Sequence, residues 1–116
     1  MRVYRVEKDK TGPFIQNTRL CKILELGYAI GTHPGLSTDW PEGYPSADIY
    51  RHVCAVPDKN LLGHWFGHAK QDLAFYGYAV VEYEAEGVVM GKSGKQCFFK
   101  LSKARSVASY SCTTIE

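Results

Sequence analysis

The residues of this 116-residue chain best spaced to bind a metal are two histidines and an aspartate near its middle. His64 and His68 are four residues apart and Asp72 follows after four more, so a continuous helix would carry all three on one face. Two imidazoles in this arrangement can reach one zinc ion, with a carboxylate as a third ligand. The glutamate that follows the first histidine in zinc peptidases is replaced by Trp65. We therefore interpret the three residues as a polar helix face and predict no metal.

Arg5 is the candidate for binding an anion inside the fold. It lies on the inward or cleft-facing side of a predicted first strand, and Gln96 lies on a predicted late strand. If these two strands lie side by side, both side chains can line one cleft. A buried guanidinium needs an anion or a carboxylate, and the chain offers structural partners in Glu7, Glu82 and Glu84. The residue types favour such a structural salt bridge over a binding cleft.

The positive charge of the chain is concentrated near its C-terminus. Residues 87–115 contain no acidic side chain and five basic ones, at Lys92, Lys95, Lys100, Lys103 and Arg105. This asymmetry indicates either an anionic or acidic partner or a solvated sheet whose lysines protect its edge from aggregation, and we favour the second interpretation. The glycines and lysines of residues 91–95 lack the spacing of a phosphate-binding loop and predict a hairpin turn.

RNA binding has one weak signal in the same region. Phe98 and Phe99 lie between lysines and would form a small stacking platform. Neighbouring residues of a strand point to opposite faces, so only one of the two rings can be exposed.

The composition predicts one soluble globular domain over residues 1–116. Apolar residues make up 45% of the chain and charged residues 22%, which argues against disorder. No apolar run reaches the length of a membrane span, and the N-terminus lacks the features of a secretory signal. We expect a cytoplasmic protein.

The periodicity of the chain predicts an α+β fold with a twisted, mostly antiparallel sheet and one or two helices packed on it. Strands are expected at 2–7, 49–56, 78–84, 88–90, 95–101 and 104–110, and a helix at 18–26. The main helix is expected to begin at Asp58, with a break near Gly67. Residues 31–48 form a Pro/Gly-rich loop of the kind often used for binding, and the tail 111–116 is expected to fray.

Several stretches resemble a group of small bacteriophage and prophage proteins. The first is Val3-Tyr4-Arg5-Val6-Glu7 followed by Thr11-Gly12-Pro13-Phe14, and the others are Leu61 to Phe66, Leu73 to Glu84 and Gly91 to Phe99. The group in turn resembles the ADP-ribosyltransferase-like fold, which binds a nicotinamide dinucleotide between a first-strand arginine and a late glutamate. This resemblance implies that Arg5 would position the dinucleotide and that Gln96 would occupy the place of the glutamate. A neutral amide cannot stabilise the developing positive charge as a carboxylate does.

These observations favour a phage-type accessory protein that binds and modulates a host protein without catalysis. An anti-defence inhibitor of the anti-CRISPR kind is one specific form of this hypothesis. The predicted binding surface combines Trp40 and Tyr44 with Lys92, Lys95 and Lys100. No cofactor is expected in this case. Two alternatives stay open: an ADP-ribosyltransferase-like enzyme that uses NAD with Arg5 and Gln96, and an RNA-binding module.

Overall fold

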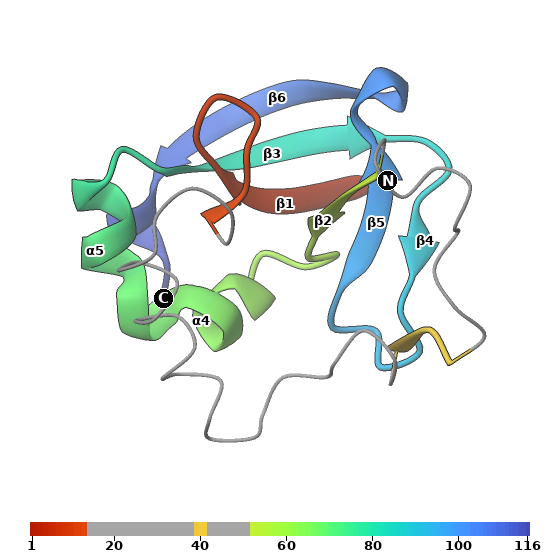
Figure 1. Ribbon diagram of the computed structural model, residues 1–116, viewed down its shortest axis with the longest axis horizontal. Coiled ribbons are helices and arrows are strands. Elements are labelled where there is room, and N and C mark those ends of the chain that lie inside the picture. Colours follow the sequence, from red (N-terminus) through yellow and green to blue (C-terminus); the bar gives the residue numbers. More distant parts are fainter. Residues whose placement is uncertain (14–38, 42–51) are drawn as a thin grey trace.

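The computed structural model describes residues 1–13, 39–41 and 52–116 of the chain (Figure 1). The predicted helix at 18–26, most of the predicted loop at 31–48, and Tyr44 lie outside these ranges. No helix in the described part of the chain has both the length and the apolar character needed to cross a bilayer.

Two three-stranded antiparallel sheets form the framework of the fold. The first sheet has the order β1-β3-β6, with β1 at Arg2–Glu7, β3 at Ala79–Ala85 and β6 at Ala104–Ser111. The second has the order β2-β5-β4, with β2 at His52–Ala55, β5 at Cys97–Lys100 and β4 at Val89–Met90. The helices lie beside the first sheet, at the end away from β4 and β5 (Figure 1). The predicted α+β class is confirmed.

The two sheets meet at β1. Tyr4 N donates to Val56 O at 2.9 Å, and Val56 N donates back to Tyr4 O at 2.8 Å, just after β2 ends. The condition for a cleft shared by Arg5 and Gln96, namely that the first and late strands lie side by side, is not met, because β1 pairs with β3 whereas β5 pairs with β2 and β4. The residues after Gln96 are apolar on both faces, which suits a strand buried between other strands rather than one lining a cleft.

The first strand divides the interior into two cores, because its side chains alternate between the faces of the sheet. Val6 belongs to the core under the helices, together with Leu62, Phe66, Ala69, Leu73, Val80 and Ile115. Val3 belongs to the core between the two sheets, together with Ala55, Tyr83, Ala85, Cys97 and Phe99.

The main helix is interrupted where the sequence predicts it. It consists of α4 at Leu61–Phe66, the 3₁₀ turn η2 at Gly67–Ala69 and α5 at Lys70–Phe75. It begins three residues later than predicted, because the Asp58 carboxylate accepts a hydrogen bond from Asn60 N at 2.9 Å in the preceding turn. His64 and His68 fall in different helical segments, so the uniform spacing of one helix does not apply to them.

The C-terminal tail packs into the core, so the prediction that it frays is wrong. Cys112 is fully buried and Ile115 is 4% exposed. Cys112 begins the 3₁₀ turn η4 at Cys112–Thr114, and Ile115 follows it directly. The Cys112 thiol donates to Tyr78 O at 3.3 Å, and burial raises its pKa to about 11. Two apolar side chains three residues apart suffice to hold the short, otherwise polar tail in place.

This packing makes Gly63 sensitive to substitution. A Cβ atom at Gly63 would lie 1.6 Å from the backbone oxygen of Glu116, whereas a Cβ at Gly67 would lie 4.0 Å from the same oxygen. We expect Gly63→Ala to lower the free energy of unfolding by about 1–3 kcal/mol through overpacking, although alanine favours a helix by about 1 kcal/mol. Urea denaturation should show no such loss for the control Gly67→Ala. Equal effects of the two substitutions would contradict this account of Gly63.

Candidate functional site

The hairpin between β4 and β5 carries a tight turn, residues 91–96, which we call the lysine turn. Gly94 N donates to Gly91 O at 3.0 Å, and Gly91 N donates to Gln96 O at 2.9 Å. Gly94 has a φ of +73°, a conformation that glycine adopts without strain. The sequence-based prediction of a hairpin turn here is confirmed.

A buried carboxylate from a distant part of the chain holds the lysine turn. Asp39 is 3% exposed and accepts three side-chain hydrogen bonds: from Ser93 N at 2.7 Å, from Ser93 Oγ at 2.9 Å and from Gln96 Nε2 at 2.7 Å. Its backbone oxygen accepts a fourth, from Lys92 N at 2.9 Å. A Cβ atom at Gly91 would lie 2.6 Å from Asp39 Oδ2, so this close approach requires glycine.

These contacts keep Asp39 ionised. Burial alone would raise its pKa, but hydrogen bonds from the Ser93 backbone, the Gln96 amide and the Ser93 hydroxyl, together with the charge of Lys95, lower the pKa below its usual value. The lysine turn therefore closes around a permanent negative charge at neutral pH.

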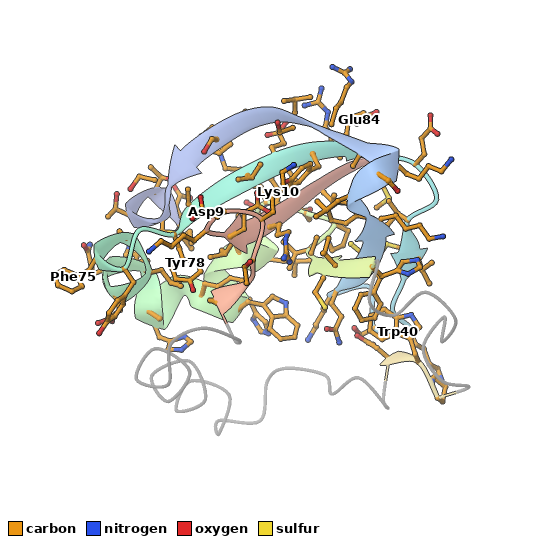
Figure 2. The ribbon with its side chains drawn as sticks, turned by 45° about the horizontal axis from the view of Figure 1, so that its top comes forward. Asp9, Lys10, Trp40, Phe75, Tyr78 and Glu84 are labelled. Atoms are coloured by element: carbon orange, nitrogen blue, oxygen red, sulfur yellow. The ribbon has the colours of Figure 1, made fainter. Side chains whose placement is uncertain are left out.

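Trp40, which the sequence predicts as part of the binding surface, is buried next to Phe98, so the exposed part of the proposed surface does not include it. It is 9% exposed and packs on Phe98 with ring centroids 4.5 Å apart. Figure 2 shows Trp40 on the short segment 39–41, at the end of the molecule opposite Phe75. The stacking platform predicted for RNA is also wrong, because Phe98 and Phe99 are both buried and β5 has its two faces covered.

The predicted lysines divide into two locations. Lys92 is exposed on the lysine turn, and Lys95 is half-buried in the same turn, where its backbone oxygen accepts a hydrogen bond from Trp65 Nε1 at 3.0 Å. Lys100 is the last residue of β5, opposite His52, about 13 Å along the strand from Gln96 at about 3.3 Å per residue. The structure thus brings together Lys92 and Lys95, but not Lys100.

Arg5 forms the structural salt bridge that the residue types favoured. Its Nε donates to Glu7 Oε2 at 3.0 Å, and its Nη1 donates to Cys54 O at 2.9 Å. Glu7 Oε1 accepts a hydrogen bond from the Tyr83 hydroxyl at 2.6 Å. Burial and then this hydrogen bond raise the pKa of Tyr83, which keeps the phenol protonated as a donor. Arg5 and Gln96 therefore bind different partners, Glu7 and Asp39, at separate places in the fold.

Sequence reasoning missed Asp39 altogether. Its partner Ser93 is 54 residues away, and no local pattern links an aspartate in a Pro/Gly-rich stretch to a distant hairpin. The only signal at that position is an acidic residue directly before Trp40.

Outside the lysine turn, the described residues form a cavity but no cluster of metal-binding side chains. No group of three His, Cys, Asp or Glu side chains comes together as a metal site within residues 1–13, 39–41 and 52–116. A cavity of about 210 Å³ lies between the start of α4 and the C-terminal tail, over Leu62, Val80 and Ile115. It is lined by none of the predicted site residues.

Comparison with known families gives one match that covers nearly the whole chain. Residues 1–113 match the family described as bacteriophage T4 Y00F protein. No curated protein and no solved structure is similar enough to the chain to count as a match.

Proposed function

Because this chain belongs to the bacteriophage T4 Y00F protein family, we propose that it is a phage accessory protein that binds a host protein through the lysine turn. Its place of action is then the cytoplasm of the infected cell. Inhibition of a host defence component, such as a CRISPR effector, is one specific form of this proposal. It is supported by the membership of the chain in a bacteriophage protein family.

The observation that carries the proposal is the rigidity of the turn. Four hydrogen bonds to Asp39 fix residues 92, 93 and 96, while Lys92, Ser93 and Gly94 remain exposed. A surface that is ordered before binding loses less conformational entropy on association than a flexible loop does. The lysine turn is therefore better suited to specific recognition than an ordinary hairpin loop.

The charge of this surface indicates the kind of partner. Lys92 and Lys95 flank the exposed tip, whereas the Asp39 carboxylate is buried beneath the turn, where it accepts hydrogen bonds from Ser93 and Gln96. An acidic patch on a protein would match this surface, and opposite charges across an interface increase both specificity and the rate of association.

We expect the double substitution Lys92→Glu/Lys95→Glu to weaken capture of the host partner by at least about tenfold, because like charges would then face each other. The measurement compares proteins from nuclease-treated host lysate that are retained by the immobilised wild type and by the variant. Lys10→Glu/Lys103→Glu is the matched control, since both lysines are exposed and lie outside the turn.

Retention of the same proteins in equal amounts by all three forms would contradict the proposal. Loss of all retained material on nuclease treatment would instead identify a nucleic acid as the ligand. We propose no ADP-ribosyl transfer, because Arg5 is bound to Glu7 and Gln96 to Asp39.

A further inference from the structure

The outer strand of the first sheet, β6, has one edge that no strand of the described residues covers. β6 runs over eight residues and pairs with β3 on one side, and the described part of the chain provides no second neighbour. Figure 1 shows β6 along the rim of the molecule, with its C-terminal end leading into η4 beside α5. The backbone N–H and C=O groups on such an edge form a template for another strand.

The sequence of β6 does little to protect this edge. Natural edge strands are usually short, or carry lysine, proline or inward-pointing charges. β6 contains no proline and a single charged residue, Arg105. Its one protective feature is an irregularity in the pairing with β3, where the register shifts between Glu82 and Tyr83. Glu82 pairs with Ala108 and Tyr83 with Ser106, and the pairing is regular on either side of this shift.

We propose that β6 is the interface of a symmetric dimer, in which it pairs antiparallel with β6 of a second copy of this chain. The middle of the strand holds no charged side chain: Val107 lies there among the small residues Ser106, Ala108 and Ser109, which allow close approach. Arg105 lies near one end, so a two-fold axis near the middle places the two arginines at opposite ends of the pair. Like charges directly opposite each other, which destabilise a strand pair, are thereby avoided.

The other edge of the sheet explains why the assembly stops at two copies. β1 is already bridged to the second sheet through the two hydrogen bonds between Tyr4 and Val56. Among the described strands, each copy then offers one long uncovered edge, and an isologous contact between two such edges closes without forming a fibre. The result is a continuous sheet in the order β1-β3-β6 followed by β6-β3-β1 of the second copy. This inference is independent of the proposed host partner.

Sedimentation equilibrium of the full chain, from about 1 µM to about 1 mM, tests the dimer. The wild type should pass from the monomer mass to the dimer mass as the concentration rises. Ser109→Lys should weaken dimerisation at least about tenfold, because it places two ammonium groups close to the two-fold axis. Ser102→Lys adds the same charge at an exposed position outside β6 and should behave as the wild type.

A wild type that remains monomeric at the highest concentration would overturn the proposal. So would a dimer that Ser109→Lys and Ser102→Lys affect equally. Circular dichroism checks that both variants fold. Amide hydrogen exchange of the wild type locates the contact independently. Protection in β6 should increase with the concentration of the wild type, and unchanged protection would also count against the dimer.

Discussion

Replacing Arg5 with alanine is expected to lower the free energy of unfolding by about 3–5 kcal/mol, the usual cost of breaking a buried ion pair. Arg5 and Glu7 are both buried on the same face of β1. Without the guanidinium, the Glu7 carboxylate keeps the hydrogen bond from Tyr83 but loses its compensating charge. The backbone oxygen of Cys54 loses a donor as well.

Arg2→Ala is the matched control, because it removes the same side chain from the same strand. Arg2 forms ion pairs with Glu82 and Glu84, but about half of its side chain is exposed. Exposed pairs contribute about 0–1 kcal/mol. The free energies of unfolding of the two variants, measured by urea denaturation, should therefore differ by several kcal/mol. Similar losses would show that the buried Arg5–Glu7 pair stabilises the fold no more than an exposed pair does.

The second large effect is expected for Asp39→Asn. We expect a loss of about 2–4 kcal/mol, since hydrogen bonds to a charged group contribute about 1.5–3 kcal/mol each and an amide presents a donor where Asp39 accepts. Gln96 and the Ser93 backbone would then lack a full acceptor. The control is Asp58→Asn, because Asp58 is exposed and accepts one local hydrogen bond from Asn60.

The pH dependence of this effect has a defined sign. The pKa of Asp39 is lower in the folded chain than in the unfolded chain. Its stabilising contribution is therefore fully present above the unfolded pKa of about 3.9 and is lost as the pH falls through the folded pKa. Denaturation at neutral and acidic pH should show the wild type and Asp39→Asn converging below about pH 4. A constant difference between them would contradict the assignment of an ionised Asp39.

The parts of the fold that could be predicted from the sequence are those with local causes. Alternation from Arg2 to Glu7 gives β1 with its full bounds, and Gly67 marks the helix break. Arg5 was expected to bind a glutamate, because a buried guanidinium requires one. Each of these conclusions depends on neighbouring residues or on the chemistry of one side chain.

The features that could not be predicted depend on contacts between distant segments. Trp40 was predicted to be a surface aromatic residue, because its contact with the distant Phe98 cannot be inferred from the sequence. The tail was predicted to fray because most of its residues are polar, and the sequence does not show that Ile115 packs into the core under the helices. The hairpin turn was expected, but its rigidity depends on Asp39, and no local period or motif specifies that pairing.

The most direct test of the central claim is a photo-crosslinking side chain placed at position 92 of the full chain in host cells. If the lysine turn binds a host protein, illumination should join the chain to one protein of defined mass. The same side chain at position 103, which is exposed outside the turn, should give no such product. A nucleic-acid adduct at position 92, or the same protein adduct at both positions, would contradict the lysine turn as a protein-binding site.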